Sequence, residues 1–295
     1  MNREPRPDFV IIGAMKCATS TLHVQLAAQP GFFMSTPKEP NYFSDDSVFA
    51  QGSTWYRSLF ADAAEADLRG ESSTHYTKIP QHADTTSRLK AELGENPPKL
   101  IYVMRHPVDR LISHYIHEWT QGIVSEGINE ALDSHPEMVN FSCYAMQLAP
   151  WIEAFGKDAI LPVFADNLRA NPQATLERVC TFLGYEGSPI WNEGKGDQNV
   201  SAVRMRKSAA RDFAAIPVLR WLRRALVPES WRTKVKSRWV MTERPELNEA
   251  SQAKLEQKFD QDLMQLGTWF GMDLNCSNWK SKAKDAQPQW VSEQA

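Results

Sequence analysis

The sequence predicts an α/β fold with three layers, in which a central parallel sheet is flanked by helices. Three segments support this fold class, because each begins with a short apolar run and continues into a helical pattern. The apolar runs are residues 8–13, 99–105 and 159–164. Parallel sheets of this kind bind ligands at the carboxyl ends of their strands, so the loops after these runs are the predicted binding sites.

The first segment, DFVIIG over residues 8–13, is predicted to be a buried strand that leads through a short loop into the helix TLHVQLAAQ. Thr19 or Ser20 can cap this helix. A helix N-terminus presents unpaired N–H groups, and Lys16 adds a full positive charge beside them. Together with the hydroxyl groups of Thr19, Ser20 and Thr21, this loop is suited to bind a phosphate.

Two alternatives to this phosphate site remain open. The loop resembles the ATP-binding pattern G-x-x-x-x-G-K-[ST], but Lys16 comes three residues after Gly13 and no second Gly precedes it. The loop can also be an ordinary turn from a strand into a helix with a capping hydroxyl.

The second segment, KLIYVMR over residues 99–105, is another predicted buried strand, and Pro107 suits the first turn of the helix after it. Arg105 stands at the end of the strand. Arg110 and Ser113 are three residues apart and therefore share one face of the helix. These residues can form a second phosphate clamp, and the alternative is a surface helix that begins at a proline.

The third segment, AILPVF over residues 159–164, is a predicted strand in which Pro162 is unusual. The helix over residues 171–184 is predicted to end at Gly184. Residues 186–202 are rich in Gly, Ser and polar side chains, which is typical of a long loop.

Length and composition predict one globular domain over residues 1–295 with flexible ends, since 42% of the residues are hydrophobic and 23% are charged. The net charge of −3 argues against a protein that binds nucleic acid. Residues 204–238 differ, with eleven Lys or Arg against two acids. Within them, residues 217–228 can form a core-facing helix with a solvated basic face, a lid over an anionic ligand, or a patch for peripheral contact with a membrane.

The four cysteines are far apart and include no C-x-x-C pair, which argues against a zinc site and against a disulfide framework. No other cluster of metal ligands is visible. The apolar run near the N-terminus is too short for a signal sequence or a membrane span. We therefore expect a cytoplasmic protein with no metal and no transmembrane segment.

In this order and separation, the two candidate loops resemble those of the sulfotransferases that use 3'-phosphoadenosine 5'-phosphosulfate (PAPS), in particular the bacterial and glycosaminoglycan-type branch. The resemblance implies a P-loop-like sulfotransferase fold with a core over residues 8–279. It also implies that the first loop holds the 5'-phosphosulfate and the second holds the 3'-phosphate. The residues assigned to PAPS in this way are Lys16, Cys17, Ala18, Thr19, Ser20 and Thr21 in the first loop, and Arg105 and Ser113 in the second.

The stretch TPKEPNYFSDD is similar to the K-E-x-x-F-F segment of this family, whose Glu is the catalytic base, and that residue is Glu39 here. His75 is the reserve candidate for the base, because other branches of the family use a His. Lys16 would stabilise the bridging oxygen of the departing phosphate. Without the resemblance, Glu39 is interpreted as a solvated loop carboxylate between Pro37 and Pro40.

The sequence departs from the family at three places. Cys17-Ala18 stands where the family usually has Thr-Gly, and Ala accepts a positive φ less readily than Gly. Ser72 stands where heparan-modifying members have a Lys that lines the acceptor cleft. The late stretch R-K-G-x-x-G-D-W has a loose counterpart in VRMRKSAARDF, where Arg206 and Lys207 would contact PAPS.

The predicted function is the transfer of a sulfuryl group from PAPS to a hydroxyl, or in second place an amine, of a carbohydrate, lipid or other small-molecule acceptor. The alternatives are a P-loop nucleotide-dependent kinase and a non-catalytic nucleotide-binding or scaffold protein. Acceptor specificity is expected in the loops at 41–58, 121–142 and 186–215, whose shapes the sequence does not predict. No oligomeric state is predicted.

Overall fold

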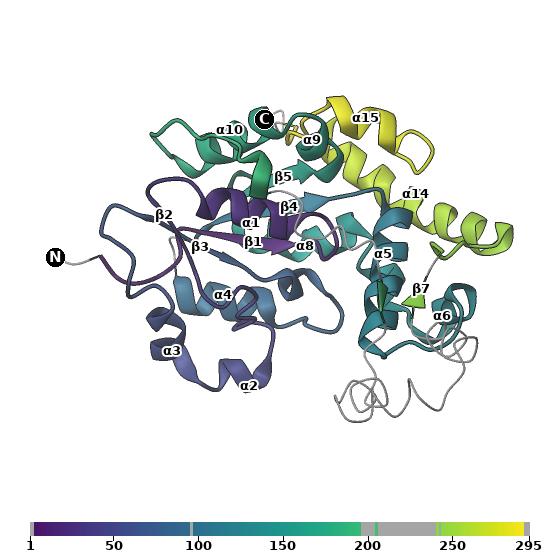
Figure 1. Ribbon diagram of the computed structural model, residues 1–295, viewed down its shortest axis with the longest axis horizontal. Coiled ribbons are helices and arrows are strands. Elements are labelled where there is room, and N and C mark those ends of the chain that lie inside the picture. Colours follow the sequence, from purple (N-terminus) through teal and green to yellow (C-terminus); the bar gives the residue numbers. More distant parts are fainter. Residues whose placement is uncertain (1–2, 95–96, 196–203, 206–239, 242, 292–295) are drawn as a thin grey trace, which may run out of the picture.

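A five-stranded parallel sheet forms the centre of the computed structural model, which describes residues 3–94, 97–195, 204–205, 240–241 and 243–291 (Figure 1). The strand order is β2-β3-β1-β4-β5, and each neighbouring pair is parallel. The strands are β1 (Phe9–Gly13), β2 (Phe32–Met34), β3 (Leu68–Ser72), β4 (Lys99–Met104) and β5 (Ile160–Phe164), and a separate antiparallel pair joins β6 (Arg204–Met205) to β7 (Val240–Met241). The predicted parallel sheet is confirmed.

Helices cover both faces of this sheet and so complete the three predicted layers (Figure 1). The chain leaves β1 and β4 toward opposite edges of the sheet. Because crossovers between parallel strands are right-handed, the helices that follow these two strands lie on opposite faces. One layer contains α1 (Thr19–Ala27), α9 (Ala165–Ala170) and α10 (Pro172–Leu183), and the other contains α4 (Thr85–Leu93) and α8 (Tyr144–Phe155).

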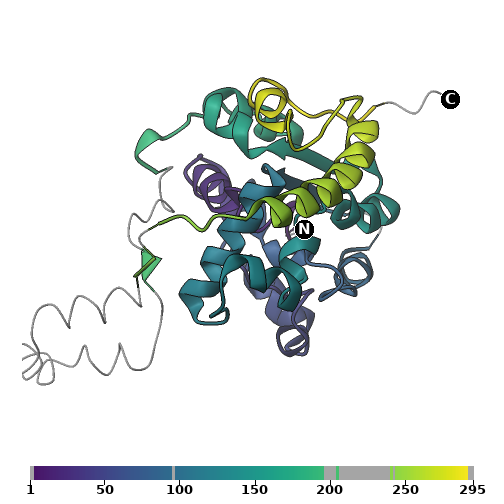
Figure 2. The ribbon, with the colours of Figure 1, turned by 90° about the vertical axis from the view of Figure 1, so that its right-hand side faces the viewer.

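A long C-terminal helix, α14 (Glu249–Phe270), packs against α8 and against α5 (Pro107–Gln121) (Figure 2). The Asp262 carboxylate accepts hydrogen bonds from the backbone N–H groups of Ala145 and Met146, both at 2.9 Å, which fixes α14 to the first turn of α8. Helix α15 (Trp279–Asp285) packs on α9. The other helices in the described ranges are the short α2 (Asp46–Phe49), α3 (Gly52–Ser58), α6 (Ile128–Ser134), α7 (Glu137–Asn140), η1 (Thr74–Thr77), η2 (Lys157–Ala159) and η3 (Glu193–Lys195). Within the described ranges, no helix combines the length and the apolar character that a membrane span requires.

The three predicted strand-then-helix units are all present. Pro107 lies in the first turn of α5, and α10 ends at Gly184, whose φ of 79° is the left-handed conformation that favours glycine. Pro162 is accommodated because β5 is an edge strand, where one side of the backbone needs no partner strand. Two of the loops expected to determine acceptor specificity contain short helices, namely α2 and α3 in one and α6 and α7 in the other.

Strands β2 and β3 were not predicted, and β3 shows why. Its sequence LRGES contains no apolar run, yet both charged side chains are buried. The Arg69 guanidinium donates to the Glu4 carbonyl at 2.8 Å, and the Glu71 carboxylate accepts from the Tyr56 hydroxyl. Partners that are distant in the sequence therefore supply hydrogen bonds to both buried charged groups of this strand.

The carboxyl edge of the sheet opens between β1 and β4. The chain leaves β1 toward β2 on one side and leaves β4 toward β5 on the other. The Ala14 N–H donates to the Val103 carbonyl at 2.8 Å, which holds the loop after β1 beside β4. Open α/β sheets bind their ligands at this kind of switch point, where neighbouring loops part from each other.

Candidate active site

Three polar loops meet at the carboxyl edge of the neighbouring strands β3, β1 and β4. The Glu39 N–H donates to the Ser72 carbonyl at 2.9 Å, which attaches the segment around Glu39 to the end of β3. Lys16 follows β1, and Arg105 follows β4. Along the edge, the predicted base, the predicted lysine of the phosphosulfate loop and the predicted arginine for the 3'-phosphate therefore stand in that order.

Helix α1 begins without a capping side chain. Its N-cap residue is Ala18, with φ 64° and ψ 19°, and no side-chain hydrogen bond is made there. The prediction that Thr19 or Ser20 caps the helix is wrong, because the left-handed turn at Ala18 already places both residues inside the helix. The alternative of an ordinary turn with a capping hydroxyl is wrong for the same reason. No N-cap side chain competes with an anion for the N–H groups of the first turn.

Lys16 and Arg105 bring two positive charges to this opening. Neither side chain has a hydrogen bond or an ion pair within the ranges that the structure describes. Burial, followed by the charges of Arg110 and Arg105, lowers the pKa of Lys16 below its ordinary value. The cations therefore repel one another, and an anion bound between the loops would relieve this repulsion.

Cys17 packs beneath the loop instead of facing a ligand. Its side chain is fully buried, and burial raises the pKa of the thiol to about 11. The Tyr144 hydroxyl lies 3.7 Å from the Cys17 sulfur and donates to the Arg105 carbonyl at 2.5 Å. Tyr144 thus joins the two candidate loops from below, and only the backbone of Cys17 can contribute to a ligand site.

The second loop and α5 divide their polar residues between the surface and the core. Ser113 is half-buried, whereas Arg110 is fully buried. Arg110 Nε donates to Ser142 Oγ at 2.6 Å, and Arg110 Nη2 donates to the Met138 carbonyl at 2.8 Å. The alternative of a simple surface helix is therefore wrong at Arg110, whose charge lies beneath the site.

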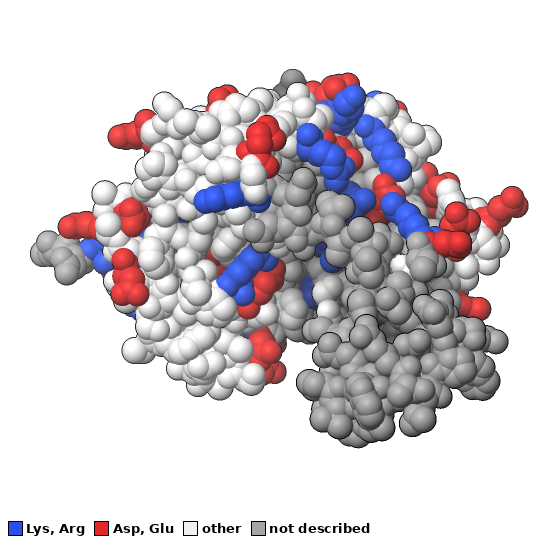
Figure 3. Space-filling view, in the orientation of Figure 1, with Lys and Arg blue, Asp and Glu red and all other residues white. Residues whose placement is uncertain are grey.

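Further basic residues gather around the first turn of α5. Asp109 forms ion pairs with Arg244 at 2.6 Å and with Lys280 at 3.0 Å, and the charge of Arg105 acts on the same carboxylate. Figure 3 shows Lys and Arg side chains over α15, the helix that carries Lys280. The single charge of Asp109 does not balance those of Arg105, Arg244 and Lys280. A net positive charge therefore remains where the 3'-phosphate is predicted to bind.

The Glu39 carboxylate is held from two sides and still reaches solvent. Its Oε2 accepts the Thr74 N–H at 2.7 Å and the Thr74 hydroxyl at 3.1 Å. Its Oε1 lies 2.5 Å from Lys38 Nζ, and the side chain is 30% exposed. A fixed, accessible carboxylate suits a general base better than the freely solvated loop residue of the alternative interpretation.

His75, the reserve candidate for the base, is stacked on a second histidine. Its ring packs on the His82 ring at 5.1 Å between centroids, and its buried Nδ1 has no hydrogen-bond partner in the described part of the chain. Burial, with the charges of Lys78 and His82, lowers the pKa of His75 to about 4. Of the two candidates for the base, Glu39 is the one that is accessible and oriented by its neighbours.

His23, which was not among the predicted site residues, also lies beside the candidate site. His23 Nδ1 lies 2.8 Å from Ser72 Oγ. Burial and then Lys38 lower the pKa of His23 to about 4, while Glu39 raises it, so His23 lies close to the predicted base. One sequence feature could have predicted this location. His23 is four residues after Thr19, so the two residues share one face of α1.

Left-handed backbone conformations mark the two sides of the site. The non-glycine residues with positive φ in the described ranges are Lys16 (69°), Ala18 (64°), Glu39 (58°) and Asn41 (55°). Each such conformation costs about 1–3 kcal/mol and persists only where the surrounding structure holds it. Their restriction to these two loops supports a functional role for both.

Replacing Ala18 with Gly is expected to stabilise the protein by about 0.5–1 kcal/mol, because Gly adopts a φ of 64° without strain. Part of the gain is offset by the greater entropy of the unfolded chain and the loss of a half-buried methyl group. Urea unfolding measures this difference. Ala27→Gly at the other end of α1 is the matched control and should destabilise; a destabilised Ala18→Gly protein would contradict the assigned conformation.

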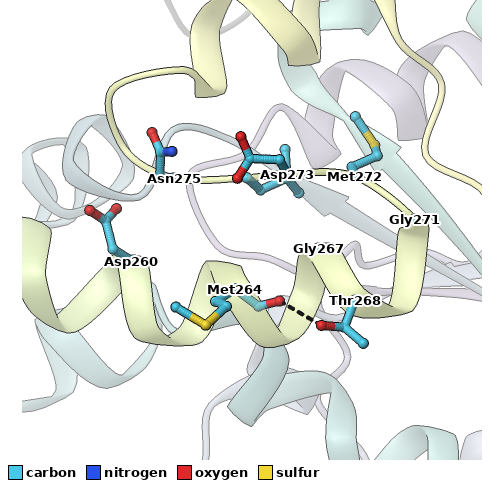
Figure 4. A pocket seen from close by; sticks show the side chains of 9 residues that line it. Asp260, Met264, Gly267, Thr268, Gly271, Met272, Asp273 and Asn275 are labelled. Atoms are coloured by element: carbon cyan, nitrogen blue, oxygen red, sulfur yellow. Dashed lines mark hydrogen bonds between the residues drawn. The ribbon is translucent and has the colours of Figure 1, made fainter.

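Two open cavities in the described ranges lie outside these loops. One, of about 570 Å³, is bounded by α14 and the loop after it, including Met264, Thr268 and Asp273 (Figure 4). The other, of about 510 Å³, is lined by residues from 28–30 and 188–194. None of the predicted site residues lines either cavity, so neither belongs to the candidate active site.

Two predicted contacts with PAPS, Arg206 and Lys207, lie outside the described residues, as do residues 217–228. Their assignments to the ligand, to a lid or to a membrane patch therefore stay predictions.

The fold is that of an α/β protein whose sheet carries Lys16, Arg105 and the Glu39 carboxylate along one edge. The family model of the sulfotransferase domain matches residues 6–267, so the chain belongs to the sulfotransferase domain family. A crystal structure of a sulfotransferase from Alicyclobacillus acidocaldarius has the same fold, with a TM-score of 0.65 and 19% identity over 93% of this chain and 99% of that one.

Relatives with assigned names support the same family. Heparan sulfate glucosamine 3-O-sulfotransferase 3A1 of Mus musculus is 26% identical over 240 residues, which cover 74% of this chain and 59% of that protein. Bifunctional heparan sulfate N-deacetylase/N-sulfotransferase 2 of Bos taurus is 26% identical over 216 residues, which cover 64% of this chain and 24% of that protein. The chain thus spans less than two thirds of the length of these relatives.

Proposed function

We propose that this chain transfers a sulfuryl group from PAPS to a hydroxyl group of a carbohydrate or other small-molecule acceptor. The observation that carries the proposal is the order of Glu39, Lys16 and Arg105 along the ends of β3, β1 and β4. This order provides a base, a cation for a leaving phosphate and a cation for a second phosphate on one edge. Membership of the sulfotransferase domain family supports the same reaction.

The residues present fit PAPS. The first turn of α1 has no N-cap side chain, and the side chains of Lys16 and Arg105 have no protein partner in the described ranges. Lys16 and the α1 N-terminus would hold the 5'-phosphosulfate, and Arg105 with Ser113 would hold the 3'-phosphate. When bound, PAPS supplies a sulfuryl group that is activated by its bond to phosphate.

The chain's own residues account for the remaining chemistry. Glu39 accepts the proton of the acceptor hydroxyl, and Thr74 keeps its carboxylate in place. Lys16 stabilises the charge that develops on the leaving oxygen. Sulfuryl transfer, like phosphoryl transfer, depends mainly on positioning and charge stabilisation, and this scheme requires no metal.

The acceptor is inferred from chemistry and from the names of the relatives. Those names refer to heparan sulfate as the acceptor for O- and N-sulfation, so a carbohydrate hydroxyl is the first choice here and an amine is the second. Ser72 stands where heparan-modifying members of the family have a Lys that lines the acceptor cleft, and its hydroxyl lies 2.8 Å from His23 Nδ1. We infer that this site binds a less anionic acceptor than heparan sulfate.

A cytoplasmic setting belongs to the same proposal. The cysteines are buried free thiols, as expected in a reducing compartment, and none forms a disulfide.

Calorimetric titration with 3'-phosphoadenosine 5'-phosphate, AMP and ATP tests the ligand. We expect the bisphosphate to bind best, and Arg105→Ala to weaken its binding about 10- to 100-fold because a charge-assisted phosphate contact is lost. The affinity for AMP should change little, because AMP carries no 3'-phosphate. Arg169→Ala, at an exposed arginine on α9, is the matched control.

The other outcomes point to the alternatives. Tighter binding of ATP with magnesium-dependent turnover would replace the proposal with a P-loop kinase. Preference for the bisphosphate without transfer of a labelled sulfuryl group from PAPS to heparan sulfate, simple sugars or phenols would favour a non-catalytic nucleotide-binding or scaffold protein.

A further inference from the structure

A second lysine, Lys78, follows Thr77, whose hydroxyl donates to the Ile12 carbonyl at 2.9 Å near the end of β1. Lys78 directly follows η1, the short helix after β3 that also carries Thr74. Its Nζ lies 5.7 Å from the centroid of the Phe141 ring, and its side chain is half-buried. No hydrogen bond or ion pair engages this ammonium within the described part of the chain. Apart from the face of the Phe141 ring, this half-buried charge has no direct partner in the described ranges, which is unusual unless a ligand completes its surroundings.

Lys78 and Lys16 are influenced by some of the same charged residues. Glu39, Glu118 and Arg110 act electrostatically on Lys78, and Arg110 and Glu118 also act on Lys16. Glu118 is held on α5 by His114, whose Nε2 lies 3.3 Å from Glu118 Oε1. The two ammonium groups therefore share neighbours, with Glu39 on the side of Lys78.

We propose that Lys78 is a further catalytic residue, which stabilises the negative charge on the oxygens of the sulfuryl group during transfer. This inference rests on the proposed function. The acceptor oxygen forms a bond to sulfur, the bond between sulfur and the 5'-phosphate oxygen breaks, and the hydroxyl proton passes to Glu39. Lys78 keeps all its protons throughout and acts through its charge.

The division of charge in the site explains why a second cation is needed. Lys16 acts on the leaving oxygen, and Glu39 on the acceptor side is negative. The sulfuryl group moves between Lys16 and Glu39, and a loose transition state spreads charge over its oxygens. A positive side chain is therefore needed beside these oxygens. The nearby Ser72 cannot supply this charge, since its side chain is a neutral hydroxyl bonded to His23. Lys78, six residues further along the chain, can supply it.

Lys78 is expected to titrate in the range of ordinary assays. Burial lowers its pKa to about 8, Glu39 and Glu118 oppose this lowering, and Arg110 adds to it. The titratable and charged groups that face Lys78 are Glu39, His75, His82, Arg110, His114 and Glu118. The free protein should therefore lose the Lys78 charge as the pH rises through about 8, and a bound anion should raise the pKa of Lys78.

The test compares Lys78→Met and Lys78→Arg with Lys90→Met, a change at an exposed lysine on α4. Calorimetry measures the affinities for PAPS and for 3'-phosphoadenosine 5'-phosphate, and release of labelled sulfate from PAPS measures transfer to water without an acceptor. For Lys78→Met we expect PAPS affinity to fall about tenfold relative to that of the bisphosphate, and transfer to fall about 10²–10³-fold. Thermal unfolding of each variant shows whether the fold is kept.

The conservative variant separates a catalytic charge from a structural one. Lys78→Arg should retain most of the affinity for PAPS. The pH at which this affinity falls should be higher than in wild type, because Arg stays charged. Lys78→Met with unchanged PAPS affinity and unchanged transfer, in a protein that still binds the bisphosphate, would overturn the inference alone. Failure of wild type to bind the bisphosphate would overturn the proposed function and this inference together.

Discussion

Replacing Glu39 with Gln is expected to lower the rate of sulfuryl transfer about 10²–10⁴-fold, the usual contribution of a positioned general base. Gln keeps an oxygen that can accept the Thr74 N–H bond seen at 2.7 Å, so the loop should stay in place. Affinity for 3'-phosphoadenosine 5'-phosphate should hardly change, because Glu39 lies at the acceptor end of the edge. The measurement is transfer of labelled sulfuryl from PAPS to heparan sulfate and to small phenols.

Two controls make the Glu39 result specific. Glu65→Gln, at an exposed position, should leave transfer unchanged. With 4-nitrophenol, which ionises near neutral pH, Glu39→Gln should lose much less activity than with an unactivated phenol, because an ionised acceptor needs no base. Transfer within about threefold of wild type on every acceptor would be too small a loss for a general base. The base would then have to be sought at His75, with His75→Asn as the next variant.

The parts of this fold that local patterns determine were predicted well. Strands β1, β4 and β5 are continuous apolar runs, and the helices after them carry clear start and stop residues, such as Pro107 and Gly184. The positions of the candidate phosphate loop and of Arg105 followed from these strand ends, and their roles stay predictions. Their adjacency depends on the strand order, which follows from packing and connection rules.

The parts that depend on distant partners were not predictable. Strand β3 buries Arg69 and Glu71, two residue types that a sequence alone predicts at the surface. Their hydrogen-bond partners, Glu4 and Tyr56, are distant in the sequence. The sequence gives no sign that Lys78 differs from an ordinary loop lysine. The charges that act on it belong to Glu39, before α2, and to Arg110 and Glu118 in α5. The spacing of residues in the sequence does not predict such long-range contacts.

Ala18 illustrates a third case, in which a local rule was outweighed. Propensity rules favour a hydroxyl residue at the N-cap and Gly at a positive φ, yet Ala occupies both roles here. The tertiary structure fixes this turn, since Cys17 packs beneath it against Tyr144. The loop thus keeps its shape without the Thr-Gly pair of the family pattern.

Replacing Lys16 with Met is the second change with a large expected effect. Lys16 is a half-buried cation in the opening between β1 and β4, and its loss should lower transfer about 10²–10³-fold by removing charge stabilisation at the leaving oxygen. Met has a similar stem and the same difficulty with the φ of 69° at this position, so the backbone strain should not change. The measurement is transfer from PAPS under saturating conditions, with Lys90→Met as the control.

The acceptor series distinguishes Lys16 from Glu39. A cation at the leaving oxygen acts whatever the acceptor. Relative to wild type, Lys16→Met should therefore lose the same factor of activity with 4-nitrophenol as with an unactivated phenol, unlike Glu39→Gln. Bisphosphate affinity should also fall, since the 5'-phosphate loses a charged neighbour, but by a smaller factor than the rate, because the charge on the leaving oxygen is greatest in the transition state. Equal losses in affinity and rate would instead show that Lys16 only binds the phosphate, and the cation that assists departure would have to be sought at Arg110 or Lys78.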